Sequence, residues 1–189
     1  MMIIYLHTKN SSRQHLVPNL IEAGLCMSLV GDILLMSNEI SSFIIGTSFF
    51  LIAHTFYIVS FNMGEEIRHI EPSYVWGRRV TYGVILCACI GNVYMLIDKM
   101  PNRVLFPLYG IALALMVCSS IKRYEFTTPY SLGFVIAGSL LFAISDNLLG
   151  FLKFNEIKSD FARMIIMLSY YAGQYLIMHG GLHHSNLLH

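Results

Sequence analysis

The chain has 189 residues, of which 56% are hydrophobic and only 12% are charged. Its mean hydropathy is +0.62, whereas soluble domains carry about 25% charged residues. This composition excludes an ordinary soluble domain and indicates a membrane protein. Because the net charge is only +1, we expect membrane lipids and no nucleic acid among its partners.

Six apolar segments come close to the roughly 20 residues that a helix needs to cross a bilayer. They are residues 17–36, 43–61, 80–97, 104–121, 130–149 and 164–182. None shows the polar and apolar alternation of a barrel strand, and backbone groups in lipid must bond within their own helix. The sequence therefore predicts an all-α bundle of about six membrane-spanning helices, forming a single domain over residues 1–189. The connections are short and polar, and "MMIIYL" is too short for the apolar core of a signal peptide.

Two of these segments repeat one arrangement around an aspartate. In "GLCMSLVGDILLM" (residues 24–36) and in "GSLLFAISDNLLG" (residues 138–150), a glycine precedes the aspartate by eight positions and a leucine follows it by three. The aspartates are Asp32 and Asp146. An ionisable side chain at membrane depth costs about 2.5–3.5 kcal/mol on insertion scales, so it normally faces a polar interior and marks a site or a pathway.

The two aspartates are expected to lie at the same depth. Their segments are the first and the fifth of the six, so both cross the membrane in the same direction. At a rise of about 1.5 Å per residue, over about four residues to each predicted helix end, both carboxyls would lie roughly 6 Å below one face. Small residues in the same segments favour close contact between the two helices: Gly24, Gly31, Gly138 and Ser145.

The span that comes next after each aspartate segment is rich in aromatic residues and contains one notable polar side chain. His54 lies in "SFFLIAHTFY" and Gln174 lies in "SYYAGQYLI". We interpret this pattern as an internal duplication, in which an aspartate helix and an aromatic helix with His or Gln occur twice. The separation of Asp32 and Asp146 gives a period of roughly 114 residues.

Four stretches together resemble the signature of a known family. "GLCMSLVGDILLM", "FIIGTSFFLIAHTFYIVSF", "GSLLFAISDNLLGF" and "SYYAGQYLIMHG" are similar to those of the YhhN-like lysoplasmalogenase family. Its members are multi-pass membrane enzymes that hydrolyse the vinyl-ether bond of lysoplasmalogens to a fatty aldehyde and a glycerophospho-ethanolamine or -choline. The resemblance implies this activity, and it points to four catalytic residues: Asp32, His54, Asp146 and Gln174. Members usually have two more helices before the first aspartate helix, so this chain is expected to lack the family's first helices.

The chemistry of a vinyl ether fits a pair of aspartates. An acid must protonate the β-carbon, and water then captures the oxocarbenium ion. Two neighbouring carboxyls in an apolar bundle do not both ionise readily, so the pair would share one proton. One aspartate would act as general acid and the other would stabilise the cation, as two carboxyls do in glycoside hydrolysis. We expect no metal and no cofactor.

The remaining polar groups at membrane depth receive supporting roles. His54 and Gln174 would orient water or the leaving oxygen. The substrate, a lysophospholipid, would be contacted by five further residues: Tyr57, Tyr170, Tyr171, Ser28 and Asn147.

Three other functions stay open. Intramembrane aspartyl proteases also use two aspartates from neighbouring helices, although their second glycine before "GD" and their Pro-Ala-Leu motif are lacking here. A zinc-dependent hydrolase of the ceramidase-like kind is suggested by "HGGLHH", in which His179 and His183 are one helical turn apart. The third is a proton-coupled carrier or lipid-binding protein without enzymatic activity, because buried acids also serve as proton relays.

The resemblance and the lack of a targeting signal favour an internal membrane, such as that of the endoplasmic reticulum in a eukaryote. Six helices are few to enclose a lipid tail, which favours a homodimer.

Overall fold

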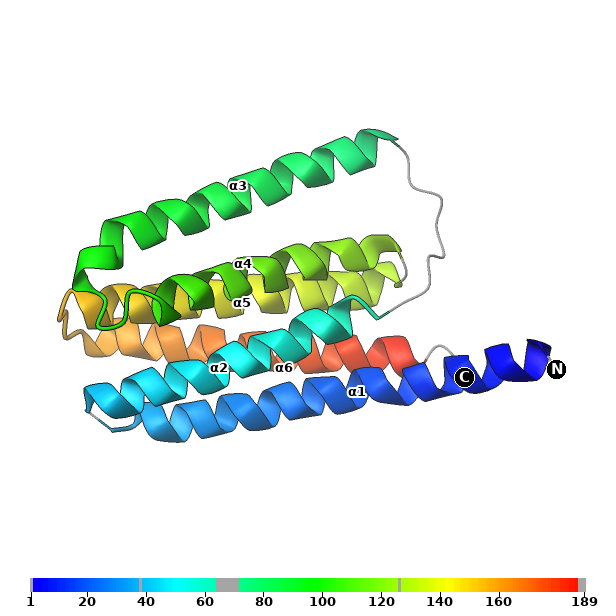
Figure 1. The fold of residues 1–189 in the computed structure, drawn as a ribbon, viewed down its shortest axis with the longest axis horizontal. Helices are drawn as coiled ribbons and strands as arrows, with labels where there is room; N and C mark the ends of the chain where they lie inside the picture. The colour runs from blue at the N-terminus through cyan, green and yellow to red at the C-terminus, as the bar shows by residue number, and fades with distance from the viewer. Residues whose placement is uncertain (1, 38, 64–71, 126, 187–189) are drawn as a thin grey trace.

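The computed structural model describes residues 2–37, 39–63, 72–125 and 127–186, and within these ranges it contains helices and no strands (Figure 1). The elements in chain order are α1 (Met2–Leu35), α2 (Ile40–Phe61), α3 (Pro72–Leu96), η1 (Ile97–Lys99), α4 (Leu105–Lys122), η2 (Arg123–Glu125), α5 (Pro129–Phe154) and α6 (Asp160–Asn186). The predicted all-α bundle of about six long helices is confirmed.

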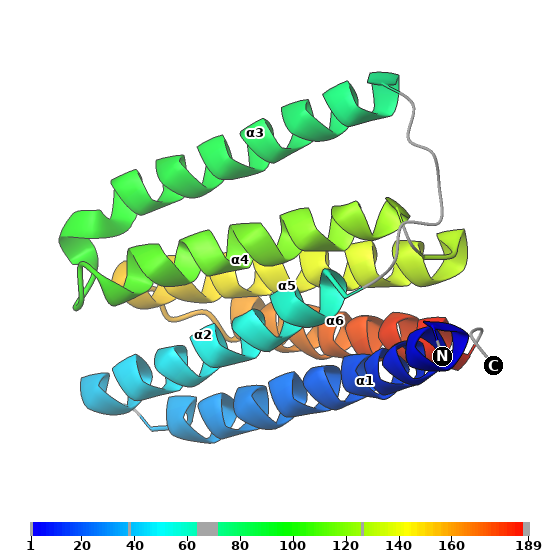
Figure 2. The same cartoon turned by 45° about the vertical axis from the view of Figure 1, so that its right-hand side comes forward.

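Five of the helices contain a segment that is long and apolar enough to cross a membrane. These segments are Leu16–Leu35, Ile40–Phe61, Tyr74–Lys99, Leu105–Glu125 and Pro129–Phe154. The sixth helix, α6, carries more polar and small residues and does not reach that hydropathy within its described part. It nevertheless packs along α5 over most of its length (Figures 1 and 2).

Several helices extend beyond their predicted ends. Helix α1 begins at Met2 rather than at residue 17, α3 begins at Pro72 rather than at residue 80, and α5 continues to Phe154 rather than ending at residue 149. Hydropathy marks only the part of a helix that lies in lipid, and polar turns can continue it into water. A proline in the first turn, as in α3 and α5, fits the helical backbone without loss of a hydrogen bond.

Five helices form a closed ring, in which each packs against two neighbours. The order around the ring is α1, α2, α4, α5, α6 and back to α1. Helix α3 lies outside this ring, next to α4 (Figures 1 and 2). Helices α1 and α5 share no extended interface among the described residues, so the predicted close contact between the two aspartate helices is wrong.

The small residues near the aspartates serve a different contact, with the helix that follows in the chain. A Cβ placed on Gly31 would lie 2.7 Å from the Phe50 ring of α2. A Cβ on Gly138 would lie 2.7 Å from the carbonyl oxygen of Gly173 on α6. The glycines therefore bring together α1 with α2 and α5 with α6, which gives two tightly packed hairpins.

The two hairpins have matching registers. The contacts that define them are Gly24 with Tyr57 and Gly31 with Phe50 in the first, and Gly138 with Gly173 and Ser145 with Ile166 in the second. Equivalent positions differ by 114 in residue number on α1 and α5, and by 116 on α2 and α6. This repeat of contacts supports the predicted duplication. It makes Tyr170, rather than Gln174, the counterpart of His54.

Candidate functional site

Two helices of the ring, α2 and α4, bring polar side chains to the carboxyl of Asp146 on α5, whose side chain is only 8% exposed. The hydroxyl of Tyr109 on α4 donates a hydrogen bond to its Oδ2 atom. The Nε2 atom of His54 on α2 lies 4.0 Å from the same oxygen. The same carboxyl oxygen therefore has both a hydrogen-bond donor and an imidazole next to it.

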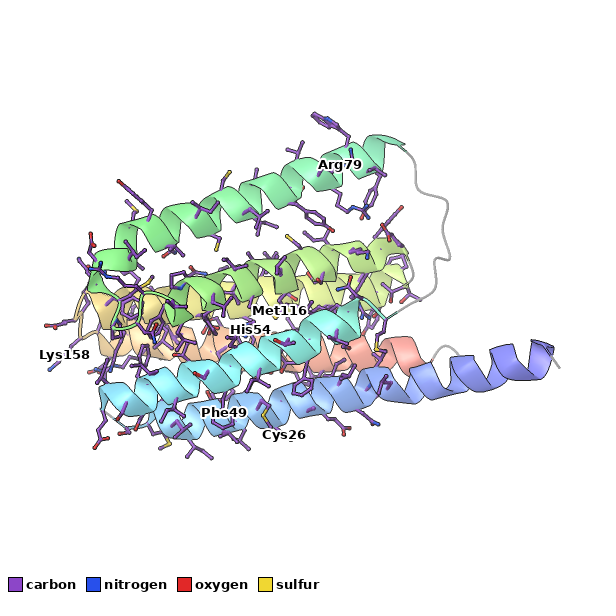
Figure 3. All side chains as sticks on the ribbon, in the orientation of Figure 1. Cys26, Phe49, His54, Arg79, Met116 and Lys158 are labelled. Carbon is purple, nitrogen blue, oxygen red and sulfur yellow. The ribbon has the colours of Figure 1, made fainter. Side chains whose placement is uncertain are left out.

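The orientation of the His54 ring is fixed by its other nitrogen. Nδ1 lies 2.5 Å from the carbonyl oxygen of Phe50, one turn earlier in α2. A carbonyl can only accept a hydrogen bond, so Nδ1 carries a proton. When the ring is neutral, the lone pair is therefore on Nε2, the nitrogen next to Asp146. The imidazole is fully buried, on the side of α2 that faces α4 (Figure 3). It packs edge-to-face against Tyr109 and Phe142, with ring centroids 5.1 and 5.0 Å away.

The carboxyl of Asp32, on α1, lies at one end of a hydrogen-bonded chain. The hydroxyl of Tyr170 donates to Asp32 Oδ2 at 3.0 Å. The amide nitrogen of Gln174 donates to the Tyr170 oxygen at 2.9 Å, and its amide oxygen accepts from the Tyr57 hydroxyl at 2.7 Å. Ser28 is buried beside Tyr57. The chain crosses the bundle between the first hairpin and the second.

The two halves of the site contact each other reciprocally. Asp32 of the first hairpin is bonded by Tyr170 of the second, while Asp146 of the second hairpin faces His54 of the first. Because His54 and Tyr170 occupy equivalent positions, this is the pattern of a two-fold relation, in which each half offers the same position to the acid of the other. Phe142, which packs on both His54 and Tyr170, joins the two halves into one cluster.

A cavity of about 490 Å³ lies against one side of this cluster. Its walls come mainly from α2, α3, α4 and α5 and are largely apolar. Polar side chains on the walls include Asp146, Tyr109, Asn92, Asn147 and Thr47. A mostly apolar hollow with a few grouped polar side chains is typical of a site for a small amphiphilic molecule.

The predicted site residues fall into three groups. Asp146 and Asn147 line the cavity. Six others lie behind it, in or beside the buried network between the hairpins: Ser28, Asp32, His54, Tyr57, Tyr170 and Gln174. Tyr171 lies outside the cluster, because it is 60% exposed on α6. Its ring contacts that of Tyr170, at a centroid distance of 5.2 Å.

Two residues of the site were missed by the sequence reasoning, Tyr109 and Phe142. Tyr109 binds the Asp146 carboxyl, and Phe142 packs between His54 and Tyr170, with centroid distances of 5.0 and 5.2 Å. Tyr109 had a visible signal, because it is an aromatic hydroxyl within the apolar span "FPLYGIALAL". Phe142 had none, since a phenylalanine in a membrane helix is ordinary.

Within the described part of the chain, no group of three or more His, Cys, Asp or Glu side chains is placed to hold a metal ion. The side chain of His183, which the zinc alternative needs, lies outside the described residues. The ring of His179 stacks on Tyr175 at 5.8 Å.

Comparison with known proteins agrees with the resemblance seen in the sequence. The sequence model of the YhhN family matches residues 1–181. Lysoplasmalogenase TMEM86B of Mus musculus is 28% identical over 173 residues, which cover 89% of this chain and 66% of that protein. Lysoplasmalogenase TMEM86B of Rattus norvegicus is 28% identical over 163 residues, covering 84% and 59%. The chain thus spans 66% and 59% of the length of these two relatives, and no solved structure matches it. With nearly its whole length matched, the chain belongs to the YhhN family.

Proposed function

We propose that this protein is a membrane hydrolase that cleaves the vinyl-ether bond of lysoplasmalogens. The observation that carries the proposal is the carboxyl of Asp146, which lines an apolar cavity and has the His54 imidazole 4.0 Å behind it. The names of the relatives support the same activity. A single-chain lipid has the shape for such a cavity, since its alkenyl tail suits the apolar walls.

The reaction begins with transfer of a proton from the acid to the β-carbon of the vinyl ether. This leaves an oxocarbenium ion, in which the positive charge is shared by the α-carbon and the ether oxygen. Water adds to the α-carbon and loses a proton, which gives a hemiacetal. Transfer of the hemiacetal hydroxyl proton and protonation of the ether oxygen then release the fatty aldehyde and the glycerophospholipid alcohol.

Asp146 is the general acid in this proposal, because it is the aspartate that lines the cavity. After it gives up its proton, the hydrogen bond from Tyr109 stabilises the carboxylate. The Asp146 carboxylate, which lines the cavity, then takes the proton from the attacking water, and the Nε2 lone pair of His54 behind it can exchange this proton with Asp146. The site then regains its starting protonation, and the net reaction consumes one water.

Asp32 acts from a distance in this scheme. It does not line the cavity, but its charge acts on the reacting centre electrostatically and favours the cation. The hydrogen bond from Tyr170, which itself accepts from Gln174, holds the Asp32 carboxyl in place. Gln174 and Tyr57 thus position the network rather than contact the substrate.

The purified protein tests this function with three lysophospholipids that share one head group and differ only in the chain linkage. A 1-alkenyl lipid should release fatty aldehyde, while the 1-alkyl lipid stays intact because it has no double bond to protonate. Release of fatty acid from a 1-acyl lipid, without aldehyde from the alkenyl lipid, would contradict the proposal and indicate a lysophospholipase instead.

A second test follows the proton that is added to carbon. In D2O the new aldehyde should carry one deuterium on the carbon next to its carbonyl. Unlabelled aldehyde added to the same D2O mixture controls for deuterium that enters the aldehyde after its release.

A double-mutant cycle tests whether the hydrogen bond from Tyr170 to Asp32 is what couples these two residues to the reaction. Asp32→Asn and Tyr170→Phe should each lower kcat by about tenfold, which corresponds to the loss of one charge-assisted hydrogen bond. The double variant should be no slower than the slower single variant, because once Asp32→Asn has removed the charge, the Tyr170 hydroxyl has no carboxylate left to hold in place. Steady-state aldehyde release measures all four proteins. Additive losses would separate the two residues and remove this role for Asp32.

We also propose the membrane of the endoplasmic reticulum as the location, which rests on the family resemblance. A homodimer stays a prediction from the small number of helices.

A further inference from the structure

Two amide side chains face each other on the cavity wall, next to the proposed acid. Asn92 comes from α3 and Asn147 follows Asp146 on α5. The amide nitrogen of Asn92 donates to the amide oxygen of Asn147 at 2.7 Å. The nitrogen of Asn147 donates to the carbonyl oxygen of Ala143, one turn earlier in α5, also at 2.7 Å.

The pair has hydrogen-bonding capacity left over. An amide has two N–H donors and an oxygen that accepts two hydrogen bonds. Among the described residues, the amide oxygen of Asn92 accepts no hydrogen bond, and its nitrogen makes only the one bond to Asn147. One acceptor and one donor from the same amide are therefore available at the wall. A hydroxyl group, which both donates and accepts, satisfies both.

The amides are not needed to attach α3 to the bundle. At its N-terminal end, Arg78 pairs with Glu125 of η2. Just after its C-terminal end, Lys99 donates to the amide oxygen of Asn155 at 2.5 Å. Helix α3 also packs along α4. The amide pair lies between these two anchors, exposed on an otherwise apolar wall, where its free hydrogen-bonding groups are accessible to a polar group of a ligand.

The proposed substrate carries such a group at the matching place. In a lysoplasmalogen the vinyl ether is attached to the first glycerol carbon, and a free hydroxyl is on the neighbouring carbon. Asn147 follows Asp146 and lines the same cavity, so a hydroxyl that is one carbon away from a vinyl ether held at Asp146 is within reach of the amide pair. We propose, building on the function above, that the Asn92 and Asn147 pair binds the free 2-hydroxyl of the lipid and positions the vinyl ether. The pair would thereby select lipids with one chain over those whose 2-hydroxyl is blocked.

Binding of two lipids that cannot be cleaved tests this inference. The lipids are 1-O-octadecyl-glycerophosphocholine with a free 2-hydroxyl and its 2-O-methyl ether, both measured with the purified full chain. We expect the parent protein to bind the hydroxyl lipid about tenfold more tightly, the size of one to two hydrogen bonds. In Asn92→Leu and Asn147→Leu this preference should fall to about one. Affinity for the 2-O-methyl lipid should persist, which also shows that the variants are folded.

Asn62→Leu is the matched control. Asn62 also links two helices through its amide, since its nitrogen donates to the Ser119 hydroxyl at 3.0 Å, but it does not line the cavity. This variant should keep the parent preference. The inference is overturned if the parent shows no preference, if the preference survives in both cavity variants, or if those variants lose both lipids alike. Because neither lipid is cleaved, a failure to hydrolyse vinyl ethers would show separately, in the aldehyde assay.

Discussion

Replacing Asp146 by asparagine should lower kcat for a lysoplasmalogen by about a thousandfold, since a positioned general acid contributes about 10²–10⁴ to a rate. Asparagine has nearly the same shape and can still accept the hydrogen bond from Tyr109, so the cavity should keep its form. The amide cannot protonate carbon. Binding of the 1-alkyl lipid should therefore stay close to that of the parent, while aldehyde release is lost.

Asp160→Asn provides the comparison. Asp160 begins α6, its carboxylate is fully exposed, and it makes a surface ion pair with Arg163 at 3.7 Å. Exposed pairs of this kind contribute little to stability, so this variant should hydrolyse the lipid at the parent rate. Near-normal kcat in Asp146→Asn, with the same variant correctly folded, would end the proposed acid role and leave a carrier or lipid-binding protein as the better explanation.

The second large effect is on folding. Gly138→Ala should lower the free energy of unfolding by about 1–3 kcal/mol, the usual cost of forcing a methyl group into a packed contact. The new Cβ would meet the carbonyl oxygen of Gly173 at 2.7 Å and the backbone nitrogen of Ile177 at 2.9 Å. Both are backbone atoms of α6, so neither can rotate away and the helices must separate. Thermal or denaturant unfolding in detergent micelles measures the change.

The same substitution at Gly133 serves as the control. Gly133 is also on α5, but a Cβ there would have no atom within 4 Å. Gly133→Ala should therefore unfold like the parent or at a slightly higher temperature, because alanine favours a helix over glycine. Equal stability of the two alanine variants would contradict the tight contact between α5 and α6.

The fold was largely predictable because hydropathy reports directly on burial in lipid. Long apolar runs such as residues 43–61 and 104–121 reappear as α2 and α4 with ends shifted by only a few residues. The ends of α1 and α3 were not predictable from hydropathy, because their outer turns are polar and no longer lie in an apolar run.

The two aspartates of the candidate site were predictable because a carboxyl at membrane depth is costly and therefore normally marks a site or a pathway. The spacing around Asp32 also repeats at Asp146. The pairs of helices that pack against each other were not predictable from the sequence. Gly31 and Gly138 look the same whether they contact a neighbour in sequence or a helix far along the chain, and only the coordinates distinguish these cases. Tyr109 reaches Asp146 only through the register of α4 against α5, about which neither segment carries information.

The reciprocal contacts of the two hairpins have one more consequence. If the hairpins were separate identical chains, the position held by His54 in one would hold the same residue in the other. Covalent fusion lets one copy keep an imidazole while the other keeps the phenol of Tyr170. In the proposed mechanism, this lets Asp146 exchange a proton with an imidazole while Asp32 is only held by a hydrogen bond. Joining the repeats in a single polypeptide thus permits the two equivalent acids to have different partners.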